Sequence, residues 1–272
     1  MMSIQVTATV MGHPWDLWGL SKIFDGSDST KTLVRAEEPN GLPTFDAINK
    51  EAINRFRVWG YDVAARLTSA ELLWDEGKGR VDLQDMRSIA DNLIERINGT
   101  AQLFDPQYKP VKPLALTWSK GDAAGASAYS EWTPNKSSTN LARFPDLIPL
   151  ARDIIALAAK EKAVKFVLDA IVLPRTWASL YLVYDAISTD MGGTHSLKKK
   201  NWVTEDDLSD FTNSANNSRE IKEGARHGKK PEQSRALISM EQAYTIINQL
   251  ALAWLSEKAG MQKIWSRYEV AP

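Results

Sequence analysis

The stretch TPNKSSTN, residues 133–140, decides how the chain is divided, because it contains only turn-forming and polar residues. Before it, short alternating apolar runs are mixed with helical ones, and after it the hydrophobic period is helical throughout. With 272 residues the chain is long enough for two domains. The sequence therefore predicts an α+β protein, with a mixed α/β domain over 1–133 and an all-α helical bundle over 141–272.

Helix caps and apolar stripes place the helices of the second half. Thr176 precedes a stripe at helical spacing made of Trp177, Leu180, Tyr181, Tyr184 and Ile187. Thr204 with Asp207, and Ser239 with Gln242, have the spacing of capping boxes. These signals predict helices that begin after residues 176, 204 and 239.

The first half shows both periods. Residues 4–10 alternate and are rich in β-branched side chains, which predicts a half-buried strand. Asp82 can cap a helix that Asn98-Gly99 would end or kink. Residues 114–118 and 127–132 indicate two strands joined by 121–125. Residues 43–75 leave two options open: a helix from Asp46, and a strand over 63–67.

Composition excludes several classes of chemistry. The chain has no cysteine, and its three histidines lie far apart without a carboxylate or histidine at helical spacing. A P-loop, a dinucleotide-binding glycine motif and a nucleophile elbow are all missing from the sequence. Glu205, Asp206, Asp207 and Asp210 could bind a divalent metal, but they are more typical of a solvated first helical turn. We therefore expect no cofactor and no metal.

Partners and location are constrained as well. The formal net charge is -1 at pH 7 and the pI is about 6.3, so nucleic acid would need a local basic patch. No apolar run is long enough for a membrane span, and no secretory signal is evident, so we expect a cytoplasmic protein without membrane contact. The ten tryptophans are scattered, which favours packing over the alternative of stacking platforms for sugars or bases.

One polar segment interrupts the helical half and carries the candidate site. Residues 216–230 lack periodicity, and from 219 to 235 basic residues outnumber acidic ones. Loops between rigid helices often carry function. The candidate residues are Asn216, Arg219, Lys222, Arg226, His227, Lys229 and Lys230, and Lys198-Lys199-Lys200 would add charge if it folds alongside.

This segment resembles the end of a HEPN domain, a helical family of toxin, antiphage and RNA-processing proteins. The resemblance lies in Arg219 followed by His227-Gly228 and then the capped helix after Ser239, and the aromatic helix 177–184 is similar to an earlier helix of that family. It spans roughly residues 145–258. It implies a dimeric, metal-independent ribonuclease in which Arg219 stabilises the scissile phosphate and His227 handles the proton of the 2′-hydroxyl.

Three interpretations of the segment stay open. The basic residues could simply turn the chain and pair locally, they could bind RNA or another ligand without cleaving it, or they could catalyse cleavage. Arg219 and His227 are spaced farther apart than the family's pair, and no other catalytic motif is complete. The whole chain also resembles bacterial two-part proteins with an α/β first half and a helical second half.

The sequence therefore favours a non-enzymatic binding or adaptor protein in a bacterial defence or phage-related assembly. Its expected partner is another protein, or a second copy through the helical domain. The alternative is the metal-independent HEPN-like ribonuclease, with Arg219 and His227 as catalytic residues. In that case RNA would bind along 219–235 through Asn216, Lys222, Arg226, Lys229 and Lys230.

Overall fold

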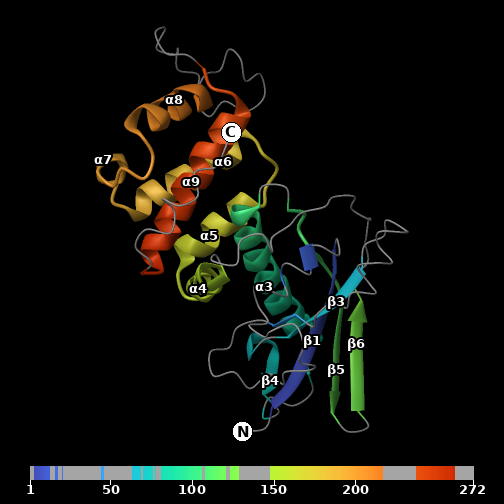
Figure 1. Ribbon diagram of the computed structural model, residues 1–272. Helices are drawn as coiled ribbons and strands as arrows, with labels where there is room; N and C mark the ends of the chain where they lie inside the picture. The colour runs from blue at the N-terminus through green and yellow to red at the C-terminus, as the bar shows by residue number, and fades with distance from the viewer. Residues whose placement is uncertain are drawn as a thin grey trace. The chain divides into compact units, whose positions relative to one another are not determined.

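The structure is a computed structural model that describes most of the regular elements of the chain. The described residues are 3–12, 16–17, 20, 44–45, 63–68, 70–75, 77, 81–105, 108–120, 123–128, 148–216 and 237–260. They contain both helices and antiparallel strands, which confirms the mixed α+β class (Figure 1).

The chain separates into two compact units, Met1–Ala156 and Leu157–Pro272, which we call the N-terminal and the C-terminal unit. Helix α4 (Ile148–Ala158) crosses this division. The linker predicted over 133–140 lies outside the described residues. The division into domains at 1–133 and 141–272 therefore stays a prediction.

Strand β1 (Ser3–Gly12) organises the sheet of the N-terminal unit. The strand order is β2-β3-β1-β5-β6, with every pairing antiparallel. The other strands are β2 (Thr44–Phe45), β3 (Val63–Thr68), β5 (Lys112–Lys120) and β6 (Ala123–Ala128). The turn η1 (Ala70–Leu72) leads into β4 (Leu73–Asp75), which pairs with the first residues of β1.

The alternation predicted for β1 is confirmed. Ile4, Val6, Ala8 and Val10 are buried, and the residues between them whose burial is described are half-buried. This is the pattern of a strand with one face in the core. The strand predicted over 63–67 is likewise present as β3, whereas the helix considered from Asp46 lies outside the described residues.

Helix α3 (Leu83–Phe104) begins as predicted but ends later. The Asp82 carboxylate accepts hydrogen bonds from the backbone N–H groups of Gln84 and Asp85, at 2.9 and 3.2 Å. The helix was expected to end or kink at Asn98-Gly99. It does not end there, because it continues to Phe104. The reason is tertiary: the buried Asn98 side chain is bonded to the backbone of Val111 and is not left to cap its own helix.

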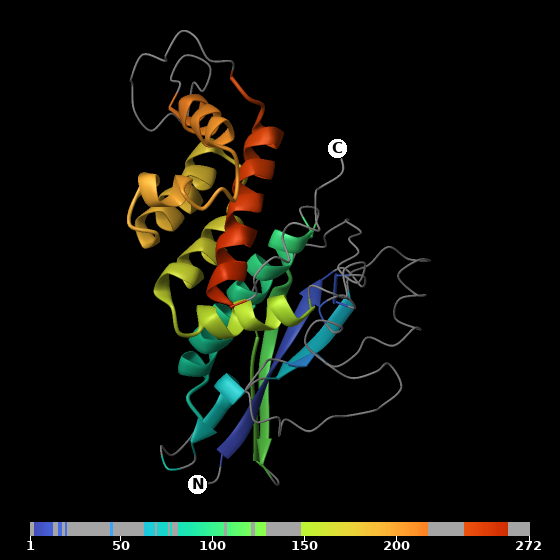
Figure 2. The same cartoon turned by 60° about the vertical axis from the view of Figure 1, so that its left-hand side comes forward.

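Helix α3 lies along one face of the sheet (Figures 1 and 2). Its buried stripe includes Met86, Ala90, Leu93, Ile94 and Ile97, as the spacing predicted. The buried Arg96 pairs with Glu71 of η1, and its Nε donates to the Asn92 carbonyl. This ion pair joins the helix to the turn that precedes β4.

The hairpin of β5 and β6 is tighter than the sequence indicated. The second strand was expected over 127–132, but β6 already begins at Ala123, and Lys120 pairs with Ala123. Residues 129–132 are outside the described part of the chain. The early start places Gly125 opposite Trp118, whose indole occupies the space above the glycine.

Replacing Gly125 by alanine is expected to lower the free energy of unfolding by about 1–3 kcal/mol, the usual cost of overpacking. A Cβ at this position would lie 2.3 Å from Nε1 of Trp118, so the indole must move away. Urea titration followed by tryptophan fluorescence measures the change. Ala126→Ser, at an exposed position of the same strand, is the control. Equal midpoints for the two variants would contradict the packing argument.

The C-terminal unit is helical in its described part. After α4 it contains α5 (Lys162–Ile171), α6 (Trp177–Asp190), α7 (Thr194–Lys198), α8 (Glu205–Ala215) and α9 (Met240–Lys258). Helix α4 ends at Ala158, and α5 ends at Ile171, three residues before Pro174, which cannot continue a helix. Helix α7 was not predicted.

The caps predicted at Thr176, Thr204 and Ser239 are confirmed, but the capping box predicted for Thr204 with Asp207 is not formed, because the Asp207 carboxylate accepts from the Thr204 hydroxyl at 2.6 Å. The hydroxyls of Thr176, Thr204 and Ser239 each accept a hydrogen bond from the backbone N–H three residues on. Ser179 and Gln242 complete capping boxes at the first and last of these helices. Helix α6 ends as expected before Gly192 and Gly193, which have φ values of 80° and 107° that favour glycine.

The core of the C-terminal unit lies between α6, α8 and α9 (Figure 2). Leu180, Val183 and Ile187 of α6 are buried, as is Trp254 of α9. Phe211 of α8 is fully buried against Trp177, Tyr181 and Tyr184 of α6, with ring centroids 5.8–6.3 Å apart. The aromatic stripe of α6 is therefore packing surface for α8.

Candidate functional site

The predicted catalytic pair and most of the predicted binding residues lie outside the described residues. These are Arg219, Lys222, Arg226, His227, Lys229 and Lys230. Asn216 is described and caps the C-terminus of α8, where its Nδ2 donates to the Thr212 carbonyl at 2.8 Å. Its Oδ1 is buried and accepts no hydrogen bond. The roles predicted for all seven residues remain predictions.

The described residues do fix where this segment leaves and re-enters the helical unit. The backbone N–H of Ile238 donates to Oγ of Ser214 at 3.1 Å, although the two residues are 24 positions apart. The two helices that flank the segment, α8 and α9, also contact each other. The segment 217–236 therefore starts and ends at one place on a rigid pair of helices.

The basic run 198–200 is largely engaged with acidic side chains. Lys198 pairs with Glu205, and Lys200 pairs with Glu257 at 2.6 Å. Lys200 also lies 5.6 Å from the ring of Trp202. The acidic residues at the start of α8 therefore act in part as local counterions, as expected for a first helical turn.

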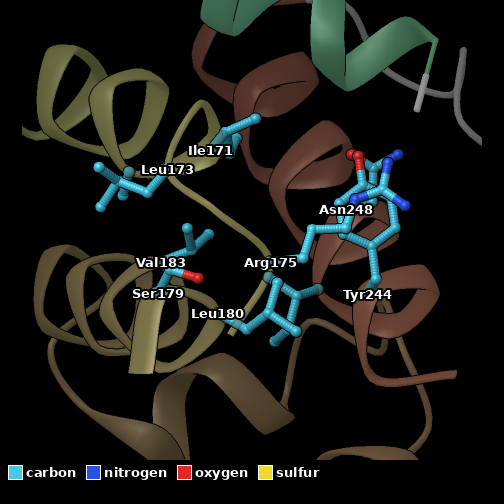
Figure 3. A pocket seen from close by; sticks show the side chains of 10 residues that line it. Ile171, Leu173, Arg175, Ser179, Leu180, Val183, Tyr244 and Asn248 are labelled. Atoms are coloured by element: carbon cyan, nitrogen blue, oxygen red, sulfur yellow. The ribbon is translucent and has the colours of Figure 1, made fainter. Parts of the chain in front are cut away.

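A hollow in the C-terminal unit lies between the end of α5, the loop after it, α6 and α9 (Figure 3). Its apolar lining includes Ile171, Leu173, Leu180, Val183 and Ile247. Arg175 crosses the opening toward α9, with its guanidinium carbon 3.9 Å from the centroid of the Tyr244 ring and its head beside Asn248 (Figure 3). This stacked arrangement holds an exposed arginine in one orientation.

The size of the hollow limits what it can do. It has space for about one water molecule, whereas small-molecule sites are typically roughly 300–1,000 Å³. Ser179 at its edge is occupied as a helix cap, because its hydroxyl donates to the Pro174 carbonyl at 2.7 Å. This hollow is therefore too small to enclose a small-molecule substrate.

Three large apolar side chains of α5, the loop after it and α6 are exposed. Phe166 of α5, Leu173 of the following loop and Leu182 of α6 are 47%, 44% and 43% exposed. We call these three residues the α5–α6 surface. Leu73 is the other large apolar side chain that the described residues expose, and it belongs to the N-terminal unit. Single exposed leucines are ordinary, whereas a large contiguous apolar patch often marks an interaction site.

A polar cluster joins the ends of α5, α6 and α9 in the same unit. Nζ of Lys258 lies 2.7 Å from Glu161 and 3.1 Å from Asp190, and Nε1 of Trp254 donates to Asp190 at 3.0 Å. Burial opposes the charge of Lys258, but the two hydrogen-bonded carboxylates outweigh it and raise the pKa of its ammonium above 10.5. All four groups are occupied with one another, which indicates a structural role.

This cluster predicts a loss of stability in alkali. Because the pKa of Lys258 is raised on folding, its contribution is complete below pH 10.5 and is lost as the pH rises through the folded pKa. When the pH is raised from neutral to above 10.5, the urea midpoint of the wild type should therefore fall further than that of Lys258→Met. Lys199→Met, at an exposed lysine, serves as the control and should follow the wild type. Parallel curves for all three proteins would contradict the assignment.

The described tryptophans favour packing over stacking platforms. Trp74, Trp202 and Trp254 are buried, while Trp118 and Trp177 are half-buried against Gly125 and Phe211. The other tryptophans lie outside the described residues. None of the tryptophans that the structure describes is an open stacking platform, because each is buried or half-buried.

Within the described ranges, no group of three or more His, Asp or Glu side chains could hold a metal ion. None of the helices described is both long and apolar enough to cross a membrane. No family model, curated protein or solved structure matches the chain.

The sequence did not indicate the hollow or the α5–α6 surface. Arg175 stands alone between Pro174 and Thr176, and its contact with Tyr244 joins residues 69 positions apart. Phe166 and Leu182 lie inside apolar helical runs, where periodicity alone does not distinguish an exposed from a buried apolar residue. The one available signal was that both residues fall beside, and not on, the most regular apolar stripe of their helix.

Proposed function

We propose that the chain is a non-enzymatic binding protein whose α5–α6 surface docks a protein partner. The observation that carries the proposal is the exposure of Phe166, Leu173 and Leu182 on adjacent elements. Removing one such side chain from water contributes about 1.5–3 kcal/mol, and interface cores are rich in such residues. A bacterial defence or phage-related assembly is the proposed setting for this partner.

The small hollow supports binding over catalysis. It gives a partner one shallow depression, with the stacked Arg175 at its rim, and leaves no room for a substrate. Stacked arginines beside apolar residues are typical of interface hot spots. Two of the polar residues that line it, Ser179 and Arg175, are held by a helix cap and an aromatic ring respectively.

The test uses a double variant of the surface and a matched control. Phe166→Ser/Leu182→Ser removes two apolar contacts, while Leu73→Ser removes an equally exposed leucine elsewhere. Affinity capture from the source cells should recover a partner with wild type and Leu73→Ser and lose it with the double variant. Binding is then measured with both purified proteins. A partner that binds all three proteins equally well would overturn the proposal.

The ribonuclease alternative concerns the segment that begins at Asn216. One observation keeps it under test: the Ser214–Ile238 hydrogen bond holds the two ends of the segment together on capped helices. A rigid support of this kind is what a catalytic loop needs. The supporting residues are described, whereas Arg219 and His227 are not.

Incubation with a mixed RNA pool in EDTA separates the two functions. Under the alternative, wild type cleaves RNA without metal and His227→Ala loses about 100-fold or more of the rate, as expected for a general base. His195→Ala, at an exposed histidine of α7, is the control and should retain full activity. Equal background cleavage by all three proteins supports the binding function and rejects catalysis.

A further inference from the structure

Strand β6 is the last strand in the order β2-β3-β1-β5-β6 and forms one edge of the described sheet (Figure 1). It pairs with β5 over all six of its residues, from Ala123 opposite Lys120 to Ala128 opposite Ala115. Along an antiparallel strand, alternate residues direct their backbone N–H and C=O groups to opposite sides. Within the described ranges the backbone of β6 bonds to β5 alone, so its outward groups line an edge about 20 Å long.

This edge lacks the features that usually keep a sheet edge from pairing with another chain. Natural edges are protected by very short strands, prolines, charged side chains or β-bulges. The sequence of β6, AAGASA, contains no proline and no charge, and its register with β5 runs without a shift. Ala124 and Ala126 are exposed, so the strand is accessible from that face. The backbone of β6 is therefore available for the addition of a further strand.

We propose that β6 pairs in antiparallel orientation with the β6 of a second copy of this chain, which joins the two sheets into one. A two-fold axis perpendicular to the sheet relates the two strands, so every hydrogen bond between them is made twice. This axis keeps each face of the sheet on its own side, and the two α3 helices therefore cover the same face of the joined sheet. Because each copy uses this edge once, the assembly closes at two copies.

The side chains of β6 favour a second copy over a different protein. When an extended peptide adds to a sheet edge, main-chain hydrogen bonds give affinity, and pockets for alternate side chains give specificity. Strand β6 carries only alanine, glycine and serine, and the Trp118 indole already fills the space above Gly125, so the strand has no side chain that could form such a pocket. Two copies of β6 need no pocket, and they bring no like charges opposite each other.

This contact goes beyond the proposed function, because it belongs to the N-terminal unit and not to the α5–α6 surface. It also differs from the expectation drawn from the sequence, which placed a second copy at the helical domain.

Sedimentation equilibrium of the full chain tests the pairing, and wild type should be a dimer. Ala126→Lys and Ala126→Glu should each weaken dimerisation at least about 10-fold, because the axis places position 126 of both copies on one face of neighbouring strands, where like charges repel. An equimolar mixture of the two variants should restore dimers, since opposite charges then meet. Ala178→Lys, the same substitution at an exposed position of α6, is the control and should dimerise as wild type does.

Three results would overturn the inference. Wild type that stays monomeric throughout its solubility range rejects the dimer, and a dimer that both charged variants retain shows that another surface forms it. A mixture that stays monomeric, although circular dichroism shows both variants folded, rejects contact between the two β6 strands. None of these results decides the proposed function, which fails separately when the Phe166→Ser/Leu182→Ser variant binds every partner as wild type does.

Discussion

Replacing Trp254 by alanine is expected to lower the free energy of unfolding of the C-terminal unit by about 3–5 kcal/mol, the usual range for removal of a buried tryptophan. Trp254 is 1% exposed and is among the largest fully buried side chains of the described residues. Its loss leaves a cavity within α9 and leaves Asp190 without its indole donor. Thermal and urea unfolding followed by helical circular dichroism measures the effect.

Trp254→Phe separates the two contributions. It keeps most of the apolar volume and loses the hydrogen bond to Asp190, so a decrease of about 1–2 kcal/mol is expected. Lys258 still occupies the same carboxylate at 3.1 Å, which limits the cost of removing the indole donor. Should the alanine variant lose less than the phenylalanine variant, the burial argument for this residue would be wrong.

The parts of the fold that the sequence predicted well are those set by local chemistry. Thr176, Thr204 and Ser239 cap their helices because each hydroxyl satisfies a backbone N–H three residues away. The alternation of β1 was equally readable, because successive side chains of a strand face opposite sides. In both cases the partner lies within a few positions, so a short window of sequence contains the whole interaction.

The parts that were missed depend on contacts between distant positions. Asn98 was expected to end or kink α3, but its side chain bonds to Val111 and the helix continues. Lys258 and Glu161 are 97 positions apart, and no local pattern relates them. The candidate surface has the same origin, because the exposure of Phe166 and Leu182 depends on which faces of α5 and α6 the rest of the unit covers.

The predicted basic segment shows a different limit of prediction from sequence. Its residues were chosen for their side-chain chemistry, which the sequence gives directly, whereas a site also requires those side chains to lie close together. The described residues establish the two ends of the segment through Ser214 and Ile238. The RNA experiment is therefore informative on its own, because it measures the chemistry without assuming any arrangement of the segment.

Replacing Asn98 by alanine should destabilise the N-terminal unit by about 3 kcal/mol, since unpaired buried polar groups cost about 1–3 kcal/mol each. Asn98 Oδ1 accepts from the Tyr108 hydroxyl at 2.6 Å and from the Val111 N–H at 2.9 Å, while its Nδ2 donates to the Val111 carbonyl at 2.9 Å. The side chain thus ties α3 to the entrance of β5. Burial, strengthened by the charge of Asp16, raises the pKa of Tyr108 well above 10.0, so the phenol remains a donor.

Two further variants show whether the network or the helix is responsible. Tyr108→Phe removes only the hydroxyl, which donates to Asn98 and also accepts a longer bond from the Val111 N–H at 3.3 Å, so a loss of about 1 kcal/mol is expected, close to the net value of one hydrogen bond. Asn92→Ala lies on the same helix, with its side chain bonded locally to Ser88, and should change stability by less than about 0.5 kcal/mol. If Asn98→Ala and Asn92→Ala unfold at the same urea concentration, the link between α3 and β5 does not depend on Asn98. Both the oxygen and the nitrogen of the Asn98 amide are hydrogen-bonded. The unfolding free energies of Asn98→Ala and Asn92→Ala should therefore differ by most of the predicted 3 kcal/mol, which is about a 100-fold change in the unfolding equilibrium.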